Sequence, residues 1–170
     1  FESSVLNTRD LNAFNNLIVI KSIGKSYGVG GLRLGILATS NEDIITSMKS
    51  NIPIWNINSI AEFYLQIIGK YRLDYVKSCK KIGLRRKELF KGLSKIKYIT
   101  PFPSEANYIL MEIKNINATK LSSDLCNRFG ILVKDCSKKI NDKNNNCIRV
   151  AVRGSRDNQY LLDCLKLFDT

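Results

Sequence analysis

The chain has 170 residues, 44% of them hydrophobic and 25% charged, a balance typical of a folded protein that can bury a core. No stretch approaches the roughly twenty apolar residues of a membrane-spanning helix, and the first residues lack the pattern of a signal peptide. We therefore expect a cytoplasmic protein with no membrane partner. Because the chain starts at Phe1 without Met, we also expect it to be part of a longer polypeptide.

Positive charge dominates, with 27 Lys and Arg against 15 Asp and Glu and a formal net charge of +12. Clusters such as Lys80-Lys81 and Arg85-Arg86-Lys87 fall in an expected helix, where we interpret them as a solvated face. No nucleic-acid-binding motif accompanies the charge, so we expect no nucleic-acid partner. Five scattered cysteines and the absence of histidine indicate neither a disulfide framework nor a metal site.

The first expected elements surround a glycine-rich segment. A β-branched run over residues 16–22 predicts a buried strand, and an apolar pattern over residues 32–38 predicts a second one. Four glycines between residues 24 and 31 exclude a regular element there. Asn41 is expected to cap a short helix over residues 42–49.

The remaining pattern alternates helices and strands. Apolar residues recur at helical spacing between Ile60 and Ile68 and again over about residues 72–94. The elements expected after these helices are a strand over 108–113, a helix over 118–129 ended by Gly130, a strand over 131–134, a polar turn over 141–146, a strand over 148–152 and a helix over 157–168.

Lys25 lies where the first expected strand meets the glycines, and Arg33 follows beyond them. A neutral amine attacks aldehydes, a guanidinium binds two phosphate oxygens, and a hydroxyl such as that of Ser22 can donate to a third. The lysine precedes the glycines, which excludes a Walker loop. The residues alone leave two interpretations open: an anion-binding loop with a reactive lysine, or a tight hairpin whose lysine points to solvent.

The string from Ser22 to Arg33 resembles S-x-x-K-x-x-G-x-x-G-x-R, the signature around the pyridoxal-phosphate (PLP) lysine of class I and II aminotransferases, the fold-type I enzymes. The resemblance extends along the chain to the relatives of histidinol-phosphate aminotransferase and threonine-phosphate decarboxylase. Their motifs are similar to Pro53–Ser59, Pro103–Tyr108, Gly130–Ser137 and Ile148–Arg153.

This resemblance implies an α/β fold that comprises the C-terminal part of the large domain and the small C-terminal domain. Residues 1–52 would be the incomplete end of the PLP-binding domain, 53–95 a helical connector and 96–170 the small α/β domain. The family's aspartate for the pyridine nitrogen and its ring-stacking aromatic would both precede Phe1, so we expect the 170 residues alone to be inactive. A homodimer is implied, and a fused upstream domain is compatible with it.

The resemblance also implies roles for single residues. Lys25 would form the Schiff base with pyridoxal 5'-phosphate and would move the α-proton as general base and acid. Ser22 and Arg33 would bind the cofactor phosphate, and Asn58 would lie near the cofactor. Arg149 would bind the substrate carboxylate as a bidentate pair.

Two further cations, Arg153 and Lys134, are expected to bind a second anionic group of the substrate. Lys134 departs from the family pattern, in which an Arg is common, and Gly24 departs from it where many relatives carry Ser. The latter change removes one hydroxyl that could bind the phosphate.

The function implied is transfer of an amino group between an amino acid with an anionic side group and a keto acid. A PLP-dependent decarboxylase of the threonine-phosphate type is the nearest alternative, because D-C-S followed by R-V-A-V-R resembles that branch. An alternative from another class is a non-catalytic basic α/β module that binds nucleic acid or a partner chain.

Overall fold

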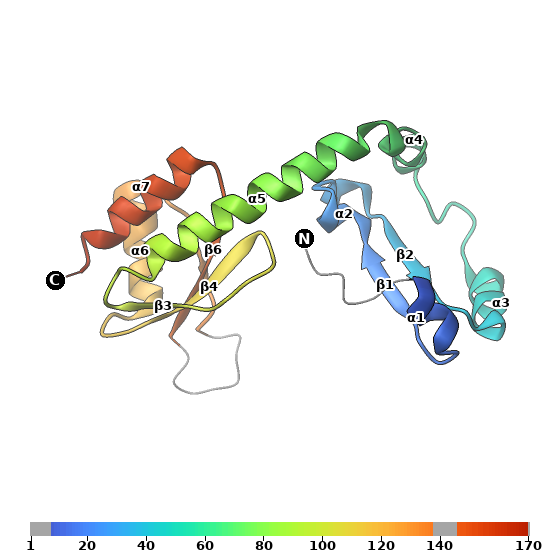
Figure 1. Ribbon diagram of the computed structural model, residues 1–170, viewed down its shortest axis with the longest axis horizontal. Coiled ribbons are helices and arrows are strands. Elements are labelled where there is room, and N and C mark those ends of the chain that lie inside the picture. Colours follow the sequence, from blue (N-terminus) through green and yellow to red (C-terminus); the bar gives the residue numbers. More distant parts are fainter. Residues whose placement is uncertain (1–7, 138–145, 170) are drawn as a thin grey trace. The chain divides into compact units, whose positions relative to one another are not determined.

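The computed structural model describes residues 8–137 and 146–169 (Figure 1). The chain divides into two compact units between Lys77 and Ser78, inside the long helix α5 (Arg72–Leu93). The N-terminal unit contains Lys25 and the C-terminal unit contains Arg149. Among the described helices, none has both the length and the apolar character that a membrane crossing requires.

A two-stranded antiparallel ribbon forms the centre of the N-terminal unit. The unit begins with α1 (Thr8–Ala13), and the ribbon pairs β1 (Val19–Ser22) with β2 (Gly35–Ala38) so that Ser22 lies opposite Gly35. Both strands are shorter than expected. The prediction of a buried strand over 16–22 is also wrong: Ile20 is 78% exposed, because no described element covers that side of the ribbon.

The glycine-rich segment joins the two strands, and it does contain regular structure. A helical turn, α2 (Ile23–Ser26), and a 3-10 turn, η1 (Gly30–Leu32), lie within it, so the exclusion of a regular element is corrected. The helical turn forms because Ser22 caps it and because the left-handed backbone occurs later, at Gly28 (φ 72°).

The remainder of the N-terminal unit is helical. The helix α3 (Glu42–Asn51) begins as predicted at Asn41, whose side-chain oxygen accepts a hydrogen bond from the Ile44 amide at 3.1 Å. After it come α4 (Ser59–Ile67) and the 3-10 turn η2 (Ile68–Tyr71), which leads into α5. The small buried cluster of this unit consists of Ile23, Leu34 and Ala61.

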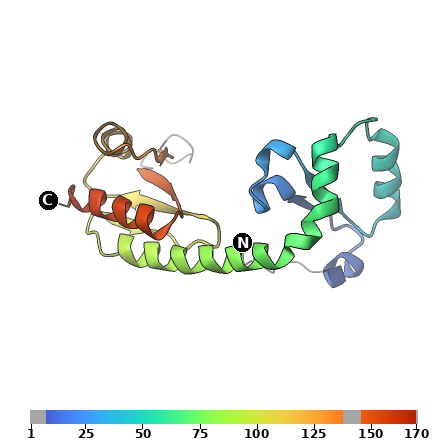
Figure 2. The same cartoon turned by 90° about the horizontal axis from the view of Figure 1, so that it is seen from above.

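The C-terminal unit contains an antiparallel sheet in the order β3-β4-β6-β5. Its strands are β3 (Ile99–Pro101), β4 (Tyr108–Ile113), β5 (Lys134–Asp135) and β6 (Cys147–Ala151), and its helices are α6 (Ala118–Phe129), α7 (Ser155–Lys166) and the second half of α5. In Figure 2 the helices α5 and α7 lie side by side. A Cβ added to Gly92 of α5 would overlap the Leu162 side chain of α7, so glycine permits this close approach.

Alternation along the strands separates the two faces of the sheet. In β4 the side chains of Ile109, Met111 and Ile113 are buried, whereas Tyr108 is exposed and Leu110 half-buried. The buried face joins the helices in one core of 17 described residues. The opposite face carries exposed polar side chains, among them Lys134 and Arg149.

Several sequence expectations need correction in this unit. The strand predicted over 131–134 is β5, which begins only at Lys134, and the short β3 was not predicted because a proline ends it. The last helix begins at Ser155 rather than at residue 157. Gly130 ends α6 with φ 66°, as predicted, whereas most of the expected polar turn over 141–146 lies outside the described residues.

Arg86 is a further correction, because it is not on a solvated face. Its side chain is 6% exposed, and its Nη1 donates to the Ala106 carbonyl oxygen at 3.0 Å. A buried guanidinium requires such partners, so Arg86 ties α5 to the segment that precedes β4.

Candidate active-site residues

Lys25 lies in the helical turn α2, and its side chain is exposed. The hydroxyl oxygen of Ser22 accepts a hydrogen bond from the Lys25 amide at 3.4 Å, and the amides of Ile23 and Gly24 both donate to the Leu34 carbonyl. These hydrogen bonds fix the turn to Ser22 on one side and to Leu34 on the other. Within residues 8–137 and 146–169 the Lys25 amine has no hydrogen-bond or ion-pair partner, so it is available to a ligand.

The glycine-rich segment folds back onto this turn. A Cβ placed on Gly24 would lie 3.3 Å from both the Gly30 Cα and the Val29 carbonyl oxygen, closer than side chains normally come. Arg33, at the end of the segment, has a left-handed backbone (φ 54°), a conformation that costs a non-glycine residue about 1–2 kcal/mol. Its guanidinium is exposed and has no ion-pair partner among the described residues.

Asn58 connects this segment to the helix α4. Its Nδ2 donates to the Leu32 carbonyl at 3.1 Å, and its Oδ1 accepts from the Ala61 amide at 2.9 Å. Asn58 therefore holds the backbone next to Arg33 and caps α4 at the same time. One N–H of its amide remains available for a ligand.

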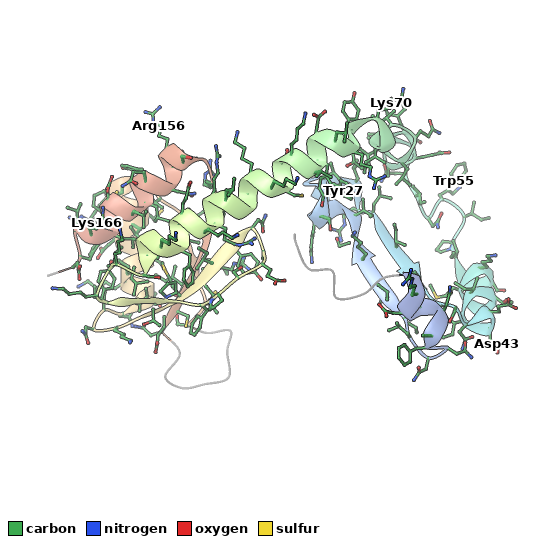
Figure 3. All side chains as sticks on the ribbon, viewed as in Figure 1. Tyr27, Asp43, Trp55, Lys70, Arg156 and Lys166 are labelled. Carbon is green, nitrogen blue, oxygen red and sulfur yellow. The ribbon has the colours of Figure 1, made fainter. Side chains whose placement is uncertain are left out.

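The aromatic residue Tyr27, which Figure 3 labels, also supports the lysine turn. Its ring stacks on that of Tyr75 in α5, with centroids 4.2 Å apart and an interplanar angle of 25°. Burial, with Tyr27 as a second cause, raises the pKa of the neighbouring Tyr64. The sequence gives no signal for this pair, because no local pattern relates two residues that are distant along the chain.

The C-terminal unit places two of the predicted cations directly opposite each other. Lys134 of β5 pairs with Arg149 of β6 in the antiparallel register, so both side chains leave the same face of the sheet. Both are exposed. The Arg149 guanidinium carbon lies 4.8 Å from the centre of the Tyr108 ring.

Arg153 has a different environment. Its Nε donates to Asp157 at 2.9 Å, and its backbone amide donates to Oδ1 of the buried Asn158 at 2.9 Å. It lines a hollow of about 410 Å³ between the Gly130–Val133 segment and α7, and Arg149 is not among the lining residues. The structure therefore does not bring Arg153 into the pair that Lys134 and Arg149 form.

A polar cluster next to Lys134 was also missed. The Thr119 hydroxyl donates to an Asp135 oxygen at 2.7 Å, and the Ser137 amide and hydroxyl both donate to the other oxygen of that carboxylate. This cluster joins the first turn of α6 to β5. It fixes the backbone that carries Lys134, and a sequence pattern gives no signal for it because Thr119 is remote along the chain.

The predicted residues thus form two groups. Ser22, Lys25, Arg33 and Asn58 surround the glycine-rich segment of the N-terminal unit. Lys134 and Arg149 share one sheet face of the C-terminal unit, with Arg153 at its own hollow. In the first group an amine suits an aldehyde, while a hydroxyl and a guanidinium suit a phosphate, so this donor set fits pyridoxal 5'-phosphate.

Comparison with known proteins identifies the class to which this fold and these residues belong. The family model for aminotransferases of class I and II matches residues 4–165. The chain belongs to this family, as the string from Ser22 to Arg33 predicted. Members of the family use pyridoxal 5'-phosphate as cofactor, and the relatives of this chain include aminotransferases and decarboxylases.

Three relatives illustrate the similarity. The chain is 34% identical over 161 residues to histidinol-phosphate aminotransferase from Thermoanaerobacter sp., covering 92% of this chain and 42% of that protein. It is 30% identical over 152 residues to L-serine phosphate decarboxylase from Campylobacter jejuni, covering 88% and 38%. A decarboxylase structure from Sulfurospirillum multivorans matches with a TM-score of 0.84 and 27% identity, covering 97% and 47%.

These matches confirm the predicted fold-type I α/β architecture. The chain spans less than half the length of each of the three relatives just described.

Proposed function

We propose that this chain is part of a PLP-dependent aminotransferase that acts on an amino acid with an anionic side group. The observation that carries the proposal is that one glycine-rich loop holds both an exposed Lys25 amine and an exposed Arg33 guanidinium, neither of which has a partner among the described side chains. A ligand with both an aldehyde and a phosphate would satisfy both groups.

Each residue of the lysine turn has its own task. Lys25 would hold the cofactor covalently through its Nζ and would accept and return the α-proton at that atom. Arg33 and the Ser22 hydroxyl bind the phosphate, and the remaining Asn58 N–H lies near the cofactor. When bound, pyridoxal 5'-phosphate withdraws electrons from the substrate Cα, which is the chemistry that the protein side chains cannot supply.

The cations of the C-terminal unit support an anionic substrate. Arg149 binds the α-carboxylate as a bidentate pair and thereby orients the bonds at Cα. Like charges directly opposite each other in a sheet are unfavourable, and an anion near Lys134 and Arg149 would relieve that repulsion. We assign the side-group anion to Lys134, with Arg153 as a second cation at the neighbouring hollow.

Covalent trapping tests the proposal. The protein encoded by the complete reading frame is incubated with pyridoxal 5'-phosphate, reduced with borohydride and digested for mass spectrometry. We expect the modified peptide to carry the cofactor on Lys25, and Lys25→Ala to lose both the label and the visible absorption band. Lys21→Ala is the matched control, because Lys21 is an exposed lysine of the adjacent strand. Equal labelling of Lys25→Ala and the control would contradict the proposal and favour a non-catalytic module.

A decarboxylase is the second candidate, and the decarboxylases among the relatives favour it. Which bond at the substrate Cα breaks depends on how the substrate is oriented, and Arg149 would set that orientation by binding the α-carboxylate. Purified protein would be assayed for carbon dioxide and for keto acid with the same amino acids. Carbon dioxide without keto acid would replace the aminotransferase assignment by the decarboxylase.

We also propose a homodimer, and we propose that these 170 residues alone do not catalyse. The segment between α3 and α4 supports the dimer, because Ile54 is 85% exposed and Trp55, labelled in Figure 3, is 91% exposed. Such large exposed apolar side chains favour a partner surface. Sedimentation of the protein from the complete reading frame should give twice the monomer mass. A monomer that retains full activity would contradict this part of the proposal.

A further inference from the structure

We propose that Tyr108 is the positioning residue for Arg149, because its ring holds the guanidinium in the orientation that binds a substrate carboxylate. This inference rests on the proposed function of Arg149 and extends it to a residue that does not itself bind substrate. The contact is a cation–π interaction, with the guanidinium carbon 4.8 Å from the ring centre.

The sheet register explains why these two side chains meet. Tyr108 pairs with Ala151 and Leu110 pairs with Arg149, so Tyr108 and Arg149 are diagonal neighbours on one face of the β4-β6 pair. Aromatic and long side chains reach each other across such a diagonal. The buried Ile109 and Val150, which pair with each other, occupy the opposite face.

The Tyr108 backbone is held unusually well for the first residue of a strand. Its carbonyl oxygen accepts a hydrogen bond from the Ser104 hydroxyl at 2.6 Å, and Ser104 also accepts from the Ala106 amide at 3.1 Å. The Ala106 carbonyl is in turn bound by the buried Arg86. The backbone that carries the Tyr108 side chain is therefore fixed to α5 through these hydrogen bonds.

Arg149, in contrast, has few constraints of its own. The side chain is exposed, and across residues 8–137 and 146–169 the ring of Tyr108 is the contact found for its guanidinium. A free arginine side chain loses considerable rotamer entropy when it binds a ligand. A ring that already restricts the guanidinium lowers this cost and leaves the N–H donors available for a carboxylate.

Two variants distinguish the contribution of the Tyr108 ring from that of its hydroxyl. Tyr108→Phe keeps the aromatic face, whereas Tyr108→Leu keeps an apolar side chain and removes that face. The matched control is Phe168→Leu, since Phe168 contacts the guanidinium of Arg128 in the same way at 5.4 Å, elsewhere in the C-terminal unit. A purely structural effect of losing an aromatic ring should appear in the control as well.

The first measurement requires no cofactor. In NMR spectra of the protein from the complete reading frame, the Arg149 side-chain Nε–H signal, assigned with Arg149→Lys, should be shifted upfield by the ring. We expect the shift to persist in Tyr108→Phe and in Phe168→Leu and to disappear in Tyr108→Leu. An unchanged Arg149 signal in Tyr108→Leu would overturn the proposal.

The second measurement uses cofactor-loaded protein and two probes that differ only by a carboxylate, O-phospho-L-serine and phosphoethanolamine. Tyr108→Leu should reduce the preference for the carboxylate-bearing probe by about twofold to thirtyfold, the range that a cation–π contact supports. Tyr108→Phe should restore the preference to within about twofold, since it keeps the ring. An equal loss in Phe168→Leu, or a wild-type protein without any preference, would overturn the proposal.

The two hypotheses fail in different ways. Absence of the borohydride label on Lys25 contradicts the proposed PLP function, whatever the state of Tyr108. A labelled Lys25 together with an unchanged probe preference in Tyr108→Leu leaves the enzyme assignment intact and removes only the role of Tyr108.

Discussion

The two compact units of this chain differ sharply in how much apolar surface they bury. Among the described residues, the core of the C-terminal unit has 17 buried members and the cluster beneath the lysine turn has three. The N-terminal unit instead exposes large apolar side chains such as Ile20, Ile54 and Trp55. The four-stranded sheet of the C-terminal unit therefore has an extensive core of its own, whereas the lysine turn rests on only a small buried cluster among the described residues.

Separate expression of the two units should show the largest effect. We expect residues 78–170 alone to unfold cooperatively in urea with a free energy on the order of 5 kcal/mol, because they contain the larger core. Residues 1–77 alone should show no cooperative transition. Circular dichroism during urea titration measures the unfolding of both fragments. A cooperative transition in residues 1–77 would contradict the expected difference in stability between the two units.

Truncation of one core leucine should be the next largest effect. Leu125 is fully buried in α6, and Leu125→Ala should lower the free energy of unfolding by about 2–5 kcal/mol, since it removes buried methyl groups and leaves a cavity. Ile20→Ala in β1 should change it by less than about 0.5 kcal/mol, because that side chain is 78% exposed. Urea titration of the 170-residue chain measures both changes. A large loss in Ile20→Ala would mean that another surface covers the ribbon.

The side chain of Asn146 makes hydrogen bonds to backbone groups of the C-terminal unit, and its removal should have the next largest effect on stability. Its Oδ1 accepts from the Ala118 amide at 2.6 Å, and its Nδ2 donates to the carbonyl oxygens of Ile113 and Ile116, each at 2.6 Å. Asn146→Ala should lower the free energy of unfolding by about 1–3 kcal/mol, because it leaves part-buried backbone groups without partners. Asn127→Ala is the control, since the exposed Asn127 amide donates to Ser123 alone among described groups. Equal thermal shifts in the two variants would contradict this role.

Removal of the Tyr98 hydroxyl should have the smallest effect on stability, and the size of this effect should depend on pH. This hydroxyl donates a hydrogen bond to the Leu165 carbonyl at 2.7 Å, so Tyr98→Phe should lower the free energy of unfolding by about 1 kcal/mol at neutral pH. Burial, and secondarily Asp169, raises the pKa of Tyr98 well above its ordinary value of 10.0. The phenol of the unfolded chain therefore ionises first, and the stabilisation is present below about pH 10 and lost as the pH rises above it.

Urea midpoints measured between pH 7 and pH 11 test this pH dependence. The wild type should lose stability above about pH 10 more steeply than Tyr98→Phe does. Tyr71→Phe is the control, because Tyr71 is 58% exposed. Parallel curves for the wild type and Tyr98→Phe would contradict the assignment.

Local chemistry allowed much of this protein to be predicted. The capping residue Asn41 and the left-handed Gly130 depend on neighbours within a few positions, and the structure confirms both. The family was also recognisable, because the string from Ser22 to Arg33 combines a lysine, glycines and an arginine at a characteristic spacing. The roles of those residues stay predictions until the experiments above are done.

Contacts between distant parts of the chain could not be predicted in this way. Three contacts join elements that only the folded chain brings together: the hydrogen bond of the buried Arg86, the stack of Tyr27 on Tyr75, and the Arg149 guanidinium over the Tyr108 ring. The sequence by itself determined which chemical groups are present and which short elements they form, because caps and turns are local. The tertiary structure decided which groups share a face, because strand register and helix packing bring together residues that no spacing rule relates.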